Sequence, residues 1–429
     1  MKNTRLEQSP NVIALLYSRR HFNPGEFTPL ENSSAGQIAK TLYTELTQLR
    51  EYEIHYFDAF DHTEWYKLRV DILITLVDNF ELAEWYFKPE KVLLIAVNQH
   101  PLERLRIAMS ARKLGYPDKA LVASDGIYQP YKKIRKSNAI LCVGNKRTAE
   151  SFEKYINGCK IVSTRYNSSF SKVEYHPSSE KIQDVLVLMS SLGFRKGFDR
   201  FLSSLESDKD QLRQFKFHIV GYCENDFWKQ KLEAISTAHP NVFYHGWILN
   251  TDPLFEKILA NSDVAIFPTR EEGLVGSLLE CLDLGILCLF TNDAGLDNHT
   301  DLLTLSSSGP LKLGDKLIEI QSLSPREICE LRESQWHSRR KQLEENRDIG
   351  ETLIALLAEG IPDRCSTTNR LSSIRTWMTF PFLSYRKILL NRLKFTSIRI
   401  IKAKIYLKSP DGYRTIIRLR NLVRGTSKK

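Results

Sequence analysis

Short continuous apolar runs alternate with amphipathic stretches along most of the chain. Strands buried on both faces of a parallel sheet read as continuous apolar runs, whereas apolar positions three or four residues apart read as helices. The regular alternation of the two is typical of α/β units. The pattern therefore predicts parallel sheets with helices packed against them.

The predicted strands fall into two series. The first consists of segments 12–17, 53–60, 71–77, 91–97, 120–124, 139–144 and 160–164. The second consists of segments 184–190, 215–221, 241–246, 263–268 and 286–291. Residues 167–181 between the series are rich in serine and other polar residues, which is typical of a linker or an exposed hinge. We therefore expect two Rossmann-like domains, because 429 residues exceed one ordinary domain.

The expected boundaries divide the chain into four parts. They are an N-terminal domain over 1–175, a second domain over 182–345, a closing helix over 346–360 and a basic extension over 361–429. The net charge of +10 is concentrated in the extension, which carries 17 Lys and Arg against two acidic residues. The first 360 residues carry 44 basic and 49 acidic residues, so the asymmetry requires its own explanation.

Residues 382–408 of the extension interleave Ile, Leu and Phe with Arg and Lys. A basic amphipathic segment of this kind favours peripheral binding to an anionic membrane surface, to which each basic group contributes about 1 kcal/mol. A solvated tail and nonspecific nucleic-acid binding are the alternatives, and nucleic acid is the less favoured partner.

Composition and motifs exclude several classes of protein. No apolar run reaches the roughly 18 to 20 residues of a membrane-spanning helix, and the first residues lack a secretory signal pattern. We therefore expect a cytoplasmic protein that associates with the inner face of the membrane. Seven scattered cysteines without a Cys-x-x-Cys pair indicate reduced thiols, not disulfides or a zinc site. The absence of Gly-x-Gly-x-x-Gly argues against a nicotinamide dehydrogenase.

The most informative segment is DVAIFPTREEGLVGSLLECLDLGILCLFT at 263–291. An apolar strand is followed by a polar loop and by a helix predicted from about Val275 to Leu284. Glu272 lies at the junction of loop and helix, and Glu280 follows after about 2.2 helical turns, so both can face one side. Unpaired N–H groups at the helix N-terminus, beside Gly273, suit a phosphate. A carboxylate there can bind sugar or ribose hydroxyls by charge-assisted hydrogen bonds.

This segment resembles the Glu-x7-Glu motif of retaining GT-B glycosyltransferases of family four. Glu272, Gly273, Glu280 and Gly285 stand at the spacing of that motif, between two apolar strands. The resemblance implies that Glu272 contacts the donor sugar and that Glu280 binds the ribose. It covers about residues 10–360 and is strongest over 184–300.

Residues 190–202 (SSLGFRKGFDRFL) resemble the phosphate loop of the same family. Lys196 and Gly197 match its Lys-Gly pair, which implies binding of the donor pyrophosphate. Ser190 and Ser191 stand where the family has Gly-Arg, but Arg195 can substitute because its guanidinium grips phosphate as a planar fork.

Two further positions in the first half match the family by place only. Residues 33–36 (SSAG) represent the glycine-rich loop after the first strand. His100, at the end of a predicted strand, stands where family members carry a functional histidine. The resemblance makes it a candidate to contact the donor sugar or the acceptor hydroxyl, although a structural residue at a strand end is the simpler interpretation.

The resemblance implies a GT-B fold, with two Rossmann-like domains whose parallel sheets face an interdomain cleft. The implied activity is that of a hexosyltransferase, which moves a sugar from a nucleotide-sugar donor to a glycan or lipid-linked acceptor in cell-surface polysaccharide assembly. Retention by front-face displacement would need neither metal nor another cofactor, because Arg195 and Lys196 neutralise the departing diphosphate. The alternatives are a GT-B protein that has lost catalysis and a non-enzymatic binding module. The Asp208-x-Asp210 pair lies in a solvated charge run and is not expected to bind metal.

Overall fold

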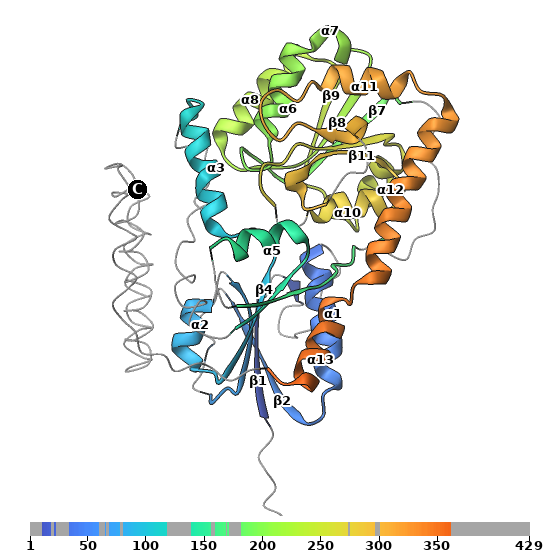
Figure 1. Ribbon diagram of the computed structural model, residues 1–429. Helices are drawn as coiled ribbons and strands as arrows, with labels where there is room; N and C mark the ends of the chain where they lie inside the picture. Colours follow the sequence, from blue (N-terminus) through green and yellow to red (C-terminus); the bar gives the residue numbers. More distant parts are fainter. Residues whose placement is uncertain are drawn as a thin grey trace, which may run out of the picture. The chain divides into compact units, whose positions relative to one another are not determined.

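The computed structural model describes two parallel sheets and the helices around them (Figure 1). The described residues are 11–18, 21–22, 34–59, 65, 68–77, 80–117, 139–155, 159–168, 170, 182–272, 275–296 and 301–361. The predicted strand at 120–124, Gly273 and the basic extension lie outside these ranges. The described residues of both sheets belong to one compact unit.

Six parallel strands form the first sheet in the order β2-β1-β3-β4-β5-β6. The strands are β1 (Asn11–Tyr17), β2 (Tyr52–Asp58), β3 (Ile72–Leu76), β4 (Lys91–Ala96), β5 (Ile140–Val143) and β6 (Lys160–Ser163). The middle strands are almost entirely buried, as their continuous apolar runs predict. In register, Leu15 of β1 lies opposite Tyr56 of β2 and Ile74 of β3.

The helices that follow these strands belong to the first sheet, with one addition from the far end of the chain. They are α1 (Ser34–Gln48), α2 (Phe80–Phe87), α3 (Pro101–Lys113), α5 (Lys146–Glu153) and α13 (Ile349–Glu359). In Figure 1, α13 lies beside α1 against the first sheet. Ile349, Leu353 and Leu356 of α13 are buried in one apolar cluster with Leu42 and Leu46 of α1. A capping box of Asp348 and Glu351 begins α13.

The second sheet is also parallel, in the order β12-β11-β10-β7-β8-β9. Its strands are β7 (Asp184–Leu192), β8 (Lys216–Cys223), β9 (Val242–Gly246), β10 (Val264–Phe267), β11 (Leu287–Thr291) and β12 (Thr304–Leu305). Its helices are α6 (Phe198–Ser207), α7 (Lys209–Leu212), α8 (Asp226–Ala238), α9 (Pro253–Ala260), α10 (Gly276–Asp283), η6 (Asn292–Ala294), η7 (Asp301–Leu303), α11 (Leu313–Gln321) and α12 (Pro325–Glu345).

Strand β7 lies at the centre of this sheet and is covered on both faces. Val185 and Val187 point into one buried apolar cluster, whereas Leu186 and Leu188 point into another. The strand order reverses at β7, because the next strand in the chain, β8, lies on one side of it and β10 lies on the other. Ligands of open α/β sheets bind beyond the carboxyl ends of the strands at such a point. The loops after β7 and β10 are therefore the place to look for a site.

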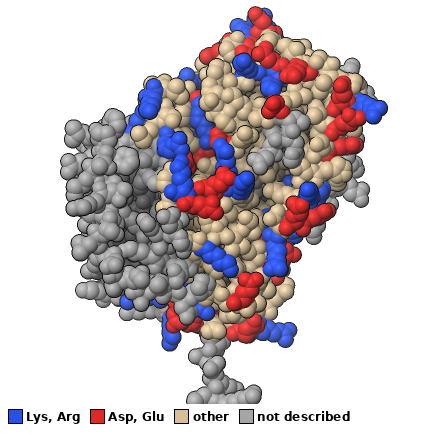
Figure 2. Space-filling model, viewed as in Figure 1, with Lys and Arg blue, Asp and Glu red and all other residues tan. Residues whose placement is uncertain are grey.

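Figure 2 shows acidic and basic side chains interspersed over the visible described surface, in keeping with the near balance of charge in the first 360 residues. Within the described ranges, no helix is long and apolar enough to cross a membrane. The six described cysteines are free thiols.

One local expectation is wrong. Helix α1 begins at Ser34 and not near Gln37, so Ser34 to Gly36 are helical and do not form a glycine-rich loop. Most of the expected linker at 167–181 lies outside the described residues, so that expectation stays a prediction. Ser168 at its beginning is buried at 2 % exposure and donates a hydrogen bond to the Asp283 carboxylate. Serine is polar enough to suggest a solvated loop, but its hydroxyl also satisfies a buried carboxylate, and composition does not distinguish the two.

Candidate donor site

Two loops meet at the point where the strand order reverses. Gly197, in the loop after β7, has φ of 73° and precedes α6. A Cβ atom at this position would overlap the Pro268 carbonyl in the loop after β10. The same loops are joined by a hydrogen bond of 3.0 Å from the Arg270 N–H to the Arg195 carbonyl. Glycine is therefore required at 197 both by its backbone conformation and by the close approach of the second loop.

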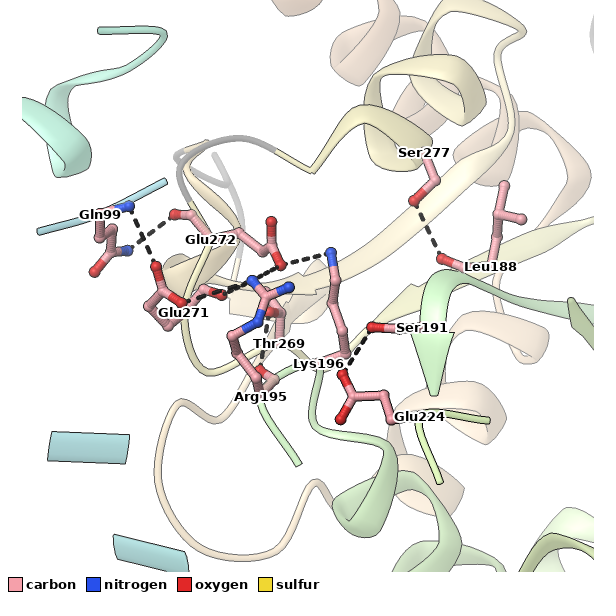
Figure 3. Close-up of polar contacts among 10 residues, drawn as sticks. All are labelled: Gln99, Leu188, Ser191, Arg195, Lys196, Glu224, Thr269, Glu271, Glu272 and Ser277. Carbon is pink, nitrogen blue, oxygen red and sulfur yellow. Dashed lines mark hydrogen bonds and ion pairs between the residues drawn. The ribbon is translucent and has the colours of Figure 1, made fainter. Parts of the chain in front are cut away.

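Four charged side chains gather where these loops meet (Figure 3). Lys196 Nζ lies 2.5 Å from Glu272 Oε1. The Arg195 guanidinium pairs with the same oxygen and lies 3.6 Å from Glu271 Oε2. The Arg195 guanidinium also donates to the Glu271 carbonyl at 3.2 Å. The structure thus brings together three residues that the sequence predicts for the site, Arg195, Lys196 and Glu272.

Burial determines the electrostatics of this cluster. Lys196 is 7 % exposed, Glu272 5 % and Glu271 0 %. Burial lowers the pKa of Lys196, and the carboxylate of Glu272 opposes that change because it favours the charged ammonium. The Glu272 carboxylate therefore stabilises the charged form of the buried Lys196 side chain. A phosphate group meets the same requirement.

Glu280 lies in α10, whose N-terminal turn is attached to β7 by the hydrogen bond from Ser277 Oγ to the Leu188 carbonyl (Figure 3). The residue is 6 % exposed, and burial, with a smaller effect of Asp283, raises its pKa to about 7. No described residue forms a hydrogen bond or ion pair with its carboxylate. Asp283, one turn later, is paired with Arg339 at 3.2 Å. Helix α10 thus buries two carboxylates. Asp283 has an ion-pair partner, whereas Glu280 has no hydrogen-bond or ion-pair partner among the described residues.

His100 is 2 % exposed, and its ring stacks on Tyr155 with 4.6 Å between ring centroids. It also meets the edge of Phe152, and its main-chain N–H donates to Ser151 Oγ at 2.9 Å. Burial lowers the pKa of His100 to about 4, so the imidazole is neutral at pH 7. The proposed contact of His100 with substrate stays a prediction.

Gln99, the residue before His100, reaches the charged cluster and was missed in the sequence. Its main-chain N–H donates to Glu271 Oε1 at 3.2 Å, and its side-chain amide donates to the Glu272 carbonyl at 3.0 Å (Figure 3). The available signal was its position in a polar loop after the apolar strand β4. Glu271 was not predicted as a site residue, because the Glu-x7-Glu motif begins at the next residue, Glu272.

A second residue of the first half contacts the same loop system. Arg147, in α5, pairs with Asp293 at 2.7 Å. The Asp293 carbonyl accepts a hydrogen bond of 3.2 Å from the Glu272 N–H. The peptide groups on both sides of the Glu272 side chain are therefore held, one by Gln99 and one by Asp293.

Position 191, where the family motif has arginine, carries no cation. Ser191 Oγ donates to Glu224 Oε1 at 2.8 Å (Figure 3). Gly193 leaves room for this carboxylate, because a Cβ atom there would overlap it. Arg195 is thus the guanidinium that this loop supplies, as the sequence predicts.

The Asp208-x-Asp210 pair has a structural place. Asp208 Oδ2 accepts a hydrogen bond of 3.0 Å from the Gly314 N–H, and the Asp210 side chain is 92 % exposed. Within the described ranges, no group of three or more His, Cys, Asp or Glu side chains could hold a metal ion. The expectation of a metal-independent reaction is not tested by this and stays a prediction.

The region of the second sheet is similar to a known protein family. Residues 183–321 match the family model described as "Glycosyl transferases group 1". No curated protein sequence matches the chain. Sucrose-phosphate synthase from Thermosynechococcus elongatus is similar in structure, with a TM-score of 0.59 and 11 % identity over 82 % of this chain and 100 % of that one.

Two other solved structures show the same fold. A trehalose-6-phosphate synthase, studied for glycosyltransfer with retention, has a TM-score of 0.55 and 10 % identity over 82 % of this chain and 99 % of its own. WaaG, a glycosyltransferase involved in lipopolysaccharide biosynthesis, has a TM-score of 0.52 and 12 % identity over 81 % and 99 %. The chain is therefore an enzyme of the glycosyltransferase type with a GT-B fold, and residues 183–321 form its group 1 glycosyltransferase domain.

Proposed function

We propose that the chain is a retaining hexosyltransferase that moves a sugar from a nucleoside-diphosphate sugar to a glycan or lipid-linked acceptor. The observation that carries the proposal is the Glu272 carboxylate, which lies against two largely buried cations at the strand-order reversal of the group 1 domain. The same two cations fit a diphosphate.

The donor diphosphate takes the place of the Glu272 carboxylate beside Arg195 and Lys196. Both are anions that keep Lys196 protonated in a buried environment, so the exchange leaves no buried cation without a partner. The displaced Glu272 becomes available to accept hydrogen bonds from the sugar hydroxyls. The Gly197 N–H already donates to the Phe194 carbonyl at 3.0 Å, so Gly197 serves the site through the turn that places Lys196 beside α6. The phosphate contact expected of Gly273 lies outside the described residues.

Glu280 binds the ribose in this proposal. A pair of ribose hydroxyls donates hydrogen bonds to the carboxylate, which supplies the donors that the described residues do not. Such donors favour the ionised carboxylate and oppose the effect of burial on its pKa. The nucleotide is thereby recognised at two places, the diphosphate and the ribose.

Retention follows from front-face displacement. The bond between the sugar C1 and the diphosphate oxygen breaks while the bond from C1 to the acceptor oxygen forms on the same face. The acceptor proton passes to the departing diphosphate, whose charge Arg195 and Lys196 stabilise. His100, neutral at pH 7, serves only as a hydrogen-bond partner of the sugar or the acceptor hydroxyl. The solved trehalose-6-phosphate synthase, for which transfer with retention is described, supports this choice.

The acceptor is proposed to be a glycan or lipid-linked glycan at the cytoplasmic face of a membrane, in cell-surface polysaccharide assembly. The role of WaaG in lipopolysaccharide biosynthesis supports this acceptor class. The charge of +15 over residues 361–429, outside the described residues, supports attachment to anionic lipid.

The test is donor-dependent stabilisation followed by product analysis. The full chain is melted with UDP-, GDP- and ADP-hexoses, because a ligand at a hundred times its Kd stabilises the folded state by about 2.7 kcal/mol. Lys196→Ala should abolish the stabilisation, whereas Lys229→Ala, on an exposed face of α8, should preserve it. Nucleotide release with an acceptor extract then reports transfer. If no nucleotide sugar stabilises the unmodified chain, the proposal is wrong.

A further inference from the structure

Gln99, in the loop after β4, reaches the donor site. Gln99 is 7 % exposed and donates two hydrogen bonds to consecutive residues, from its main chain to Glu271 Oε1 and from its side chain to the Glu272 carbonyl. Buried amides are almost always hydrogen-bonded, and a side chain that bonds a backbone carbonyl fixes the position of that carbonyl. Gln99 therefore fixes the Glu271–Glu272 turn from outside the group 1 domain.

Resting on the proposed function, we infer that Gln99 is a positioning residue of the donor site. It holds the Glu272 backbone so that the carboxylate can alternate between two places. Without donor, the carboxylate lies between Arg195 and Lys196. With donor, it contacts the sugar. Gln99 itself touches neither phosphate nor sugar in this account.

A substitution at Gln99 can remove one of its two hydrogen bonds and keep the other. The bond to Glu271 comes from the main chain and is kept by any residue except proline. The bond to the Glu272 carbonyl comes from the side chain alone. Gln99→Met keeps the length of the side chain and removes only the second bond. Gln99→Glu removes it as well and places another carboxylate beside Glu271 and Glu272, which repels both.

The role predicts a selective change in binding. A Glu272 turn that is held less firmly binds the sugar less well, while Arg195 and Lys196 stay in place for the diphosphate. Gln99→Met should therefore weaken binding of the nucleotide sugar by about three- to tenfold, the worth of one hydrogen bond, and leave binding of the nucleoside diphosphate unchanged. Gln99→Glu should weaken the nucleotide sugar further. A purely structural role would weaken both ligands equally.

Gln335 offers a matched control. It is 8 % exposed and, like Gln99, donates from its side-chain amide to a backbone carbonyl, that of Cys288, at 2.8 Å. It also accepts from the Cys288 N–H at 2.9 Å, so Gln335→Met loses more hydrogen bonds than Gln99→Met. Gln335→Met should lower the melting temperature yet leave the ratio of the two dissociation constants unchanged.

The experiment measures dissociation constants by calorimetry for UDP, GDP and ADP and for their glucose derivatives, on the full chain and its variants. The expected result is a three- to tenfold loss of preference for the sugar-bearing ligand in Gln99→Met, and none in Gln335→Met. In a Glu272→Gln background, Gln99→Met should add nothing, because it acts through Glu272. An unchanged ratio in Gln99→Met, or an equal loss of both ligands, overturns the inference while the proposed function stands. If the unmodified chain binds none of the probes, the proposed function fails and this inference fails with it.

Discussion

The uncompensated carboxylate of Glu280 makes a prediction about stability that is independent of any substrate. Burial raises its pKa from 4.5 to about 7 in the folded protein. A raised carboxyl pKa means that folding favours the protonated form, so this contribution is fully present below pH 4.5 and is lost as pH rises through about 7. At 1.36 kcal/mol per pKa unit, the ionised Glu280 destabilises the empty protein by about 3 kcal/mol at alkaline pH.

Glu280→Gln replaces the carboxyl by a neutral group of the same shape and removes this penalty. The variant should be more stable than the unmodified chain by up to about 3 kcal/mol near pH 8 and of nearly equal stability near pH 4.5. The gain is measured by urea unfolding under reducing conditions at about pH 5, 6, 7 and 8. The exposed Glu256→Gln is the control, because surface substitutions usually change stability by less than about 0.5 kcal/mol.

The same variant should lose stabilisation by a nucleotide sugar, because an amide accepts the ribose hydroxyls less strongly than a carboxylate. Stability and donor affinity therefore change in opposite directions, as is common where a functional group is held in an unfavourable environment. A stability difference between Glu280→Gln and the unmodified chain that is the same at every pH would refute the reasoning.

Three further predictions follow from the site and the chain end. Donor affinity, measured by calorimetry between about pH 5.5 and 9.5, should fall below about pH 7 as Glu280 becomes protonated; a flat profile would count against its role. Gly197→Ala should destabilise the folded protein by more than about 1 kcal/mol in urea unfolding, because the added methyl group overlaps the Pro268 carbonyl and the backbone stands at φ 73°. Removal of residues 361–429 should release the protein from vesicles containing anionic lipid in a sedimentation assay; vesicle binding that survives the deletion would show that the extension is not the membrane contact.

Much of the second sheet could be predicted because its strands are continuous apolar runs bounded by glycine and polar loops. The helix expected from about Val275 to Leu284 is found at Gly276–Asp283, and the GT-B fold is confirmed. The meeting of Arg195 and Lys196 with Glu272 was foreseeable from loop positions, because the carboxyl ends of parallel strands meet at one edge of the sheet.

The contacts of Gln99 and Glu271 were not foreseeable. They join residues 172 positions apart in the sequence, and neither residue type in a polar loop distinguishes a contact from a solvated side chain. The burial of His100 was hidden for a related reason, since its aromatic partners Phe152 and Tyr155 lie at the end of α5 and in the turn after it, where the packing has no local signature.

The return of the chain to its first sheet limits how the protein can be divided. Since α13 supplies Ile349, Leu353 and Leu356 to the apolar cluster around α1, a fragment that ends near residue 175 would expose that cluster to water. Such a piece should aggregate when expressed alone and become soluble when a peptide spanning 346–361 is supplied in trans. The apolar cluster around α1 is therefore closed by a helix from the far end of the described chain. During synthesis, this cluster cannot be completed until α13 has left the ribosome.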